Sequence, residues 1–92
     1  MPDINGDSRP RLAPGARLQF DPKRQRWLLL APERVIETEG PVHDIVKLCD
    51  GVRSIGQIVD ELARVYAAPR AEIAEDVGAL LQELLEKRLI VV

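Results

Sequence analysis

The spacing of apolar residues changes at Gly40-Pro41, and this change limits the folds that the chain can adopt. Three short segments that are alternating or apolar, as is typical of β-strands, precede it: 16–21 (ARLQFD), 26–31 (RWLLLA) and 34–39 (RVIETE). Pro32 marks a turn between the second and third segments, because its ring nitrogen has no N–H to donate to a β-ladder. The sequence therefore predicts three strands, the third of which is short and lies at the edge of the sheet.

Downstream of this point, apolar residues recur every three or four positions, which predicts three helices. The first is expected over residues 42–50, and Gly51 fits the left-handed position that ends such a helix. The second begins with a capping box, in which Ser54 caps the N–H of Gln57 while Gln57 reaches back. The third begins at Pro69, whose missing N–H would have no helical partner there.

Strands followed by helices in one small chain predict an α+β fold, with the helices packed on one face of a small antiparallel sheet. The chain has 92 residues, of which 46% are apolar, which fits a single globular domain. Residues 1–15 contain three prolines and no periodic segment, so we expect a flexible N-terminal arm before a folded domain at 16–92. Residues 89–92 read as a short strand or an apolar tail. Gly78, inside the third helix, indicates either close helix packing or room for a ligand.

The sequence offers no group suited to catalysis. Cys49 and His43 are the only cysteine and the only histidine, so we expect neither an internal disulfide nor a zinc site. Cys49 lies in an apolar helical stretch, where a buried packing role is expected rather than a reactive thiol. His43 has no obvious nucleophile partner, and no glycine-rich phosphate loop occurs. We therefore expect a protein that is not an enzyme and that binds no cofactor or metal.

Membranes and nucleic acids are not expected as partners. No apolar run is long enough to span a bilayer, and the N-terminus lacks the apolar segment of a signal peptide, so we expect a cytosolic protein. Short helices after a small sheet resemble a winged helix-turn-helix, but that DNA-binding fold needs a positive surface facing the phosphates. The second and third predicted helices are instead rich in Asp and Glu.

Charge is unevenly spread along the chain. Residues 9–34 carry seven Lys/Arg against two Asp/Glu, whereas residues 35–92 carry six against eleven. This pattern fits an ordinary solvated surface. It also fits a bipolar molecule that docks on more than one partner or on its own copy.

The edge strand is the best remaining candidate for a function. A domain without catalytic groups can act by adding a partner's extended segment to an open sheet edge, where main-chain hydrogen bonds give pairing and side-chain pockets give selectivity. Glu37, Thr38 and Glu39 would protect this edge against self-aggregation.

Several stretches of the chain resemble the family of pyrroloquinoline quinone biosynthesis protein D. The resemblance covers roughly residues 9–92. It is carried by three pieces in the family's order and spacing: Leu30-Ala31-Pro32-Glu33, Leu48-Cys49-Asp50-Gly51 and Asp76-Val77. One departure is EGPVHD before the first helix, where family members more often have an Asn- or Asp-led cap.

The resemblance implies a winged-helix-like recognition element with a three-stranded antiparallel sheet followed by three α-helices. It implies a peptide chaperone that binds the ribosomal precursor peptide of the quinone cofactor. The chaperone would present that peptide to a radical S-adenosylmethionine (SAM) enzyme, which joins a Glu and a Tyr of the peptide. In related elements the peptide adds as a strand beside the third strand and lies against the third helix. Carried over by position, the peptide-binding residues are Arg34, Val35, Ile36, Glu37, Thr38, Asp76, Val77, Leu80 and Glu83.

An alternative hypothesis is a structural module that dimerises or tethers through its edge and its basic arm, without peptide specificity. A thin core and a free edge are compatible with a homodimer, including one that exchanges the N-terminal arm between copies.

Overall fold

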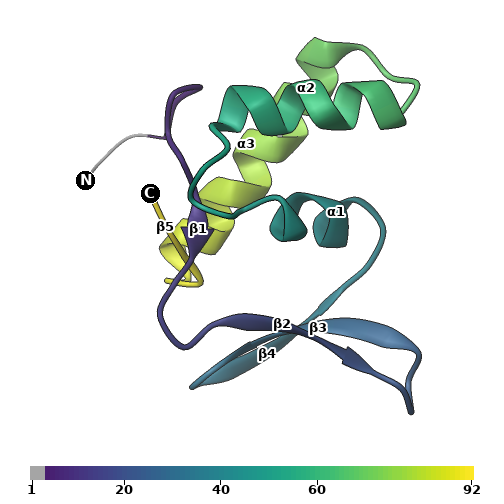
Figure 1. The fold of residues 1–92 in the computed structure, drawn as a ribbon, viewed down its shortest axis with the longest axis vertical. Helices are drawn as coiled ribbons and strands as arrows, with labels where there is room; N and C mark the ends of the chain where they lie inside the picture. The colour runs from purple at the N-terminus through teal and green to yellow at the C-terminus, as the bar shows by residue number, and fades with distance from the viewer. Residues whose placement is uncertain (1–3) are drawn as a thin grey trace.

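The structure is a computed structural model that describes residues 4–92. It contains five strands and three helices in the described part of the chain (Figure 1). In chain order these elements are β1 (Arg11–Leu12), β2 (Arg17–Asp21), β3 (Arg26–Ala31), β4 (Arg34–Thr38), α1 (Pro41–Lys47), α2 (Ile55–Val65), α3 (Arg70–Glu86) and β5 (Ile90–Val91).

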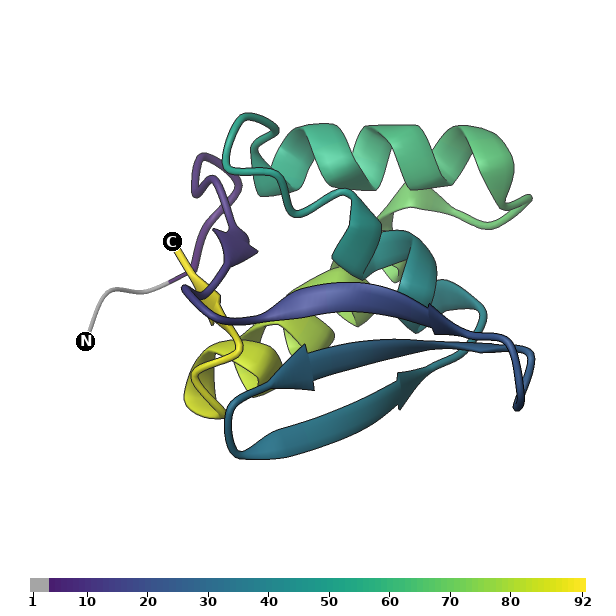
Figure 2. The ribbon, with the colours of Figure 1, turned by 60° about the horizontal axis from the view of Figure 1, so that its bottom comes forward.

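The three predicted strands form one antiparallel sheet in the order β2-β3-β4. In the register of the last pair, Ala31 lies opposite Arg34, so Pro32 and Glu33 alone make the turn. Figure 2 shows β4 at one border of the sheet and β2 at the other. The predicted edge position of the third strand is therefore confirmed.

One face of the sheet packs against the helices. Leu29, in the central strand, is completely buried. Leu18 and Ile36 lie next to it on β2 and β4 and pack against the same core. The helices supply most of the remaining core, including Ile45, Val46, Ile58, Val59, Leu62, Val77, Leu81 and Leu84. Figure 1 shows the three helices on one side of the sheet, as the α+β prediction requires.

The helix boundaries follow local capping. In α2 the capping box is present as predicted, because Ser54 Oγ accepts from the Gln57 N–H and Gln57 Oε1 accepts from the Ser54 N–H. Helix α3 begins directly after Pro69. Helix α1 is shorter than the predicted 42–50: it ends at Lys47, and the next two N–H groups donate to carbonyls three residues back, which tightens the chain into a turn.

The N-terminal segment is more structured than the sequence led us to expect. From residue 4 onward it makes backbone hydrogen bonds with the folded part of the same chain, and β1 pairs with β5 in a second, two-stranded sheet. The carbonyls of Gly6, Ser8 and Pro10 accept from the N–H groups of Gly56, Ile55 and Gly51. The first three residues of the predicted arm lie outside the described part of the chain. The mobility of the arm and the domain boundary at residue 16 remain predictions.

Gly78 is not explained by close helix packing, and the open space beside it lies away from the predicted peptide site. No heavy atom lies within 4 Å of the place where a Cβ would sit, so the glycine is not required by close helix packing. It borders a hollow between α3, the start of α2 and residues 4–6. Helical spacing puts it on the flank of α3 opposite Asp76 and Leu80, so it makes no room on the side where the peptide was expected.

Candidate functional site

The candidate site begins with the backbone of β4. In a hairpin closed by a two-residue turn, the closing pair, here Ala31 and Arg34, exchanges both of its hydrogen bonds. Backbone groups then alternate in direction along the strand, so those of Ile36 and Thr38 face β3 as well. The Thr38 hydroxyl donates to the Trp27 carbonyl oxygen at 3.0 Å, which fits a carbonyl directed toward β4. The N–H and C=O groups of Val35 and Glu37 therefore face outward.

These outward groups have no protein partner in residues 4–92. Every backbone hydrogen bond outside the helices and sheet ladders involves other residues, and no side chain bonds to the Val35 or Glu37 backbone. Unpaired backbone groups along a strand are a ready template for pairing with another chain. The chain therefore does not close this border with its own described residues.

The side chains of β4 divide between the two faces of the sheet. Arg34, Ile36 and Thr38 point to the helix side, where Ile36 is half-buried and Thr38 is buried. Val35, which is 62% exposed, and Glu37 point to the opposite face. Of the five predicted residues on this strand, Val35 and Glu37 thus offer a neighbouring strand their backbone, while Arg34 and Ile36 direct side chains toward α3.

The predicted residues of α3 have different environments. Asp76, Leu80 and Glu83 recur at helical spacing on one flank of the helix. Asp76 and Glu83 are exposed, whereas Leu80 is half-buried and packs against the core. Val77 is completely buried, so it forms part of the floor beneath this flank rather than an open contact surface.

Two surface hollows lie near the two ends of β4, and each is lined in part by residues of α3. The larger, of about 500 Å³, lies at the start of β4, where Arg34 shares it with Glu86, Lys87 and Arg88 at the end of α3. The smaller, of about 150 Å³, lies just beyond the other end of β4 and is lined by Pro41, Tyr66, Ile73, Asp76 and Val77, among others. The flank of α3 therefore runs beside β4 in the opposite direction, with Leu80 and Glu83 between the hollows.

The two hollows differ in chemical character. The larger contains three cationic side chains and two carboxylates, and among them Lys87 pairs with Glu83 at 3.3 Å. The smaller is mainly apolar, and Asp76 and Tyr66 are among its lining residues. The Tyr66 hydroxyl donates to Asp44, and this hydrogen bond raises the pKa of the tyrosine. A guest with both charged and apolar side chains would find complementary groups at both ends of β4.

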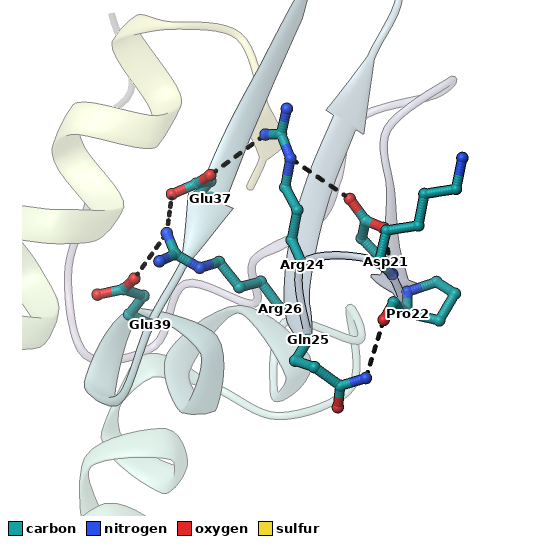
Figure 3. Close-up of polar contacts among 8 residues, drawn as sticks. Asp21, Pro22, Arg24, Gln25, Arg26, Glu37 and Glu39 are labelled. Atoms are coloured by element: carbon teal, nitrogen blue, oxygen red, sulfur yellow. Dashed lines mark hydrogen bonds and ion pairs between the residues drawn. The ribbon is translucent and has the colours of Figure 1, made fainter.

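An ionic cluster crosses the outer face of the sheet beside β4 (Figure 3). The Glu37 carboxylate pairs with Arg26 at 2.7 Å and with Arg24 at 3.4 Å, and Arg26 also reaches Glu39 at 3.3 Å. These groups are well exposed, so each pair stabilises the fold only weakly. The cluster nevertheless holds the Glu37 side chain on the outer face. Neither arginine was predicted as a site residue. Arg26 lies diagonally across from Glu37 on the same face of the sheet, because it is two residues before Leu28, which pairs with Glu37.

Cys49 and His43, the two residues considered for catalysis, both take part in packing. Cys49 is buried, as predicted, and burial raises the pKa of its thiol to about 12. The His43 ring stacks on Trp27 with centroids 5.1 Å apart. Within residues 4–92 no group of three His, Cys, Asp or Glu side chains could hold a metal ion, and no helix is long and apolar enough to cross a membrane.

Known proteins resemble this chain in both sequence and fold. A sequence profile of the family described as Coenzyme PQQ synthesis protein D (PqqD) matches residues 26–90, from the start of β3 to the start of β5. The chain belongs to the PqqD family. Its PqqD relatives include a protein of Rhodopseudomonas palustris (strain BisB5), described as a PqqA binding protein, that is 52% identical over 91% of this chain and 82% of the relative. A PqqA binding protein of Xanthomonas axonopodis pv. citri is 46% identical over 98% of both chains.

Two solved PqqD structures share the fold. One is the solution NMR structure of the PqqD truncation of Methylobacterium extorquens PqqCD, described as a functional and stand-alone recognition element for ribosomally synthesized and post-translationally modified peptides. It matches with a TM-score of 0.81 and 36% identity over 97% of this chain and 95% of that one. The crystal structure of PqqD from Xanthomonas campestris matches with a TM-score of 0.61 and 42% identity over 97% and 99%. The expected family and the winged-helix-like α+β fold are confirmed.

Proposed function

We propose that this chain is a non-catalytic peptide chaperone of pyrroloquinoline quinone biosynthesis that holds the PqqA precursor peptide as an added strand along β4. The open backbone of Val35 and Glu37 is the observation that carries the proposal, because strand addition requires unpaired N–H and C=O groups. The description of its relatives as PqqA binding proteins supports the identity of the guest.

Within this proposal the nine predicted peptide-binding residues have three roles. Val35 and Glu37 pair through their backbone. Arg34, Asp76, Leu80 and Glu83 contact side chains of the guest in the groove between β4 and α3. Ile36, Thr38 and Val77, which are half-buried or buried, hold the groove in shape from below.

The proposal extends to a handover step. As the family resemblance implies, the chaperone would present the bound peptide to a radical SAM enzyme that joins a Glu and a Tyr of the peptide. One chain contains both β4 and α3, so one copy is sufficient to hold one guest and the proposal requires no homodimer.

Proline substitution on β4 tests the proposal directly. Val35→Pro and Glu37→Pro each remove one outward N–H, and both should weaken PqqA binding measured by calorimetry by roughly fivefold or more, since a lost hydrogen bond costs about 1 kcal/mol. Val35→Ala and Glu37→Ala are the matched controls. They keep the N–H and shorten only side chains of the outer face, so they should bind nearly as the wild type does.

Two outcomes would contradict the model. One is unchanged affinity in both proline variants while their circular dichroism spectra show an intact fold. The other is an NMR titration with PqqA in which the shifts lie outside residues 33–39 and 72–84. A tethering module without peptide specificity, the alternative hypothesis, would show no saturable binding of PqqA at all.

A further inference from the structure

The end of α3 carries an arginine in a backbone conformation that normally selects glycine. Arg88 has a φ of 60°, in the left-handed region. The N–H groups of Arg88 and Leu89 donate to the carbonyls of Leu85 and Leu84 at 3.0 and 2.9 Å, a pattern that ends many helices with a left-handed residue. Glycine is the usual residue there because it has no Cβ to clash. The helix end by itself therefore favours glycine at position 88 and does not account for the arginine.

Arg88 lines the larger hollow, at the start of β4, together with Arg34. Figure 2 shows the turn between β3 and β4 beside the end of α3, so two residues far apart in the chain meet at this hollow. Within residues 4–92 neither guanidinium forms an ion pair or a hydrogen bond. The third cation of the hollow, Lys87, is paired with Glu83 at 3.3 Å. Two guanidinium groups from separate elements are thus left without a partner in one hollow.

Two carboxylates, Glu33 and Glu86, also line the hollow, but neither neutralises an arginine. Of these two, only Glu86 has a side-chain contact, a hydrogen bond of 3.4 Å that it accepts from the Gln82 amide. The hollow therefore does not attract every anion. It holds an anion well only at a point that both arginines reach.

A guest strand on β4 would bring one of its own side chains to the two arginines. Residues that lie beside one another on neighbouring strands project to the same face of a sheet. Arg34 points to the helix side, so the guest residue next to it also points there, toward the end of α3. A guanidinium binds a carboxylate through two parallel N–H···O hydrogen bonds, and this geometry suits a carboxylate better than any uncharged group.

We propose that Arg34 and Arg88 together hold one carboxylate of the guest peptide and thereby fix the position of the peptide along β4. The inference rests on the strand addition proposed above and adds the chemical class of one guest group. A shift of the guest by two residues restores the same main-chain hydrogen bonds and the same side-chain faces, so the backbone of β4 alone does not select one register. A carboxylate held at the start of β4 selects it.

Arg88→Gly tests this arginine pair, because stability and peptide binding should not fall together. Glycine suits the left-handed position, so the variant should unfold at a Tm no lower than that of the wild type. Its affinity for PqqA, measured by calorimetry, should nevertheless fall about fivefold, and Arg34→Gln should show a similar loss. Arg64→Gln removes an exposed cation from the last turn of α2, so it is the matched control and should bind PqqA as the wild type does.

Changes in the peptide identify the carboxylate. Each Asp and Glu of PqqA is replaced in turn by Asn or Gln, and one further peptide carries a C-terminal amide. One of these changes should weaken binding to the wild type about fivefold and have no effect on binding to the double variant Arg34→Gln/Arg88→Gly. A replaced side chain would assign the contact to an Asp or Glu of the guest, and the amide would assign it to the C-terminus.

Glu86→Gln gives an independent test with the opposite sign. The substitution removes a like charge from the hollow in which the guest carboxylate would lie. It should therefore strengthen PqqA binding roughly twofold, since repulsion between exposed charges is weak.

Three results overturn the proposal: wild-type affinity in the folded Arg88→Gly variant, an equal loss of affinity in Arg64→Gln, or no guest carboxylate whose effect disappears in the double variant. The proline variants of β4 separate this failure from failure of the proposed function. If Val35→Pro and Glu37→Pro weaken binding but Arg88→Gly does not, only the carboxylate contact is wrong. If the proline variants bind as the wild type does, strand addition is wrong and the carboxylate contact falls with it.

Discussion

At the scale of single residues, a few side chains make disproportionate contributions because the core is small. Leu29 is completely buried at the centre of the middle strand, where it contacts the helix layer. Asp50 acts through polar contacts instead. Its carboxylate accepts from the N–H groups of Val52 and Arg53 at 2.9 and 2.8 Å, and from the Arg53 guanidinium at 2.6 Å.

Leu29→Ala should lower the free energy of unfolding by about 2–5 kcal/mol, because it removes buried methyl groups and leaves a cavity that the sheet cannot fill by local movement. Urea denaturation measures this change. Val65→Ala, at a position that is 75% exposed, is the control and should change stability little. An equal effect of both variants would show that Leu29 does not hold the sheet to the helices.

Asp50 should make stability depend on pH in the acid range. The backbone N–H of Arg53, then that of Val52, lowers the pKa of this carboxyl below its ordinary value of 3.8. A depressed folded-state pKa contributes stability that is complete above the unfolded value and is lost as pH falls through the folded one. Thermal unfolding between pH 5 and pH 2 should therefore show a smaller loss of Tm in Asp50→Asn than in the wild type, from a lower starting value. Parallel curves would contradict this role.

At the scale of elements, agreement between sequence and structure depended on how local each signal is. The strands from residue 17 to 38 and the capping box of α2 were predictable because period-two apolar spacing, Pro32 and the Ser54–Gln57 pair act over a few residues. The pairing of β1 with β5 was not, because two-residue strands show no period and their partners are far apart in the chain. The division of the β4 residues between outward backbone groups and helix-facing side chains was not predicted either, because it depends on the hairpin register.

Gly51 joins α1 to α2 and is a position where only glycine fits without strain. Its φ of 79° lies in the left-handed region, and an added Cβ would come within 3.3 Å of Arg11 Cβ. Gly51→Ala should therefore destabilise the fold by about 1–2 kcal/mol, measured by chemical denaturation. Gly6→Ala is the matched control, because no atom lies within 4 Å of its added Cβ, and it should be neutral or slightly stabilising.

At the scale of the whole molecule, the two ends of the chain close the fold. Strand β1 pairs with β5, and the preceding residues cap N–H groups at the junction of α1 and α2. Leu89 and Ile90 are buried beside them. The segment before residue 16 therefore contributes to the folded body from residue 4 onward, even though the expected recognition groove lies elsewhere.

Removing residues 1–12 should lower the free energy of unfolding by a few kcal/mol, since it exposes Ile90 and leaves three backbone N–H groups without their acceptors. PqqA affinity, measured by calorimetry well below the lowered Tm, should remain close to that of the full chain. A truncated chain that is as stable as the full one would contradict the role given to β1, whereas a folded chain that no longer binds PqqA would extend the site to the N-terminus.

The small number of outward backbone groups on β4 limits how tightly any guest can be held. Two N–H and two C=O groups give at most four main-chain hydrogen bonds, each of which contributes about 1 kcal/mol net. That is too little to retain a peptide without side-chain contacts, so discrimination among peptides must come from the hollows at the ends of the strand. A peptide held in this way can dissociate quickly. A competing protein surface needs to replace only a few main-chain hydrogen bonds to capture the peptide.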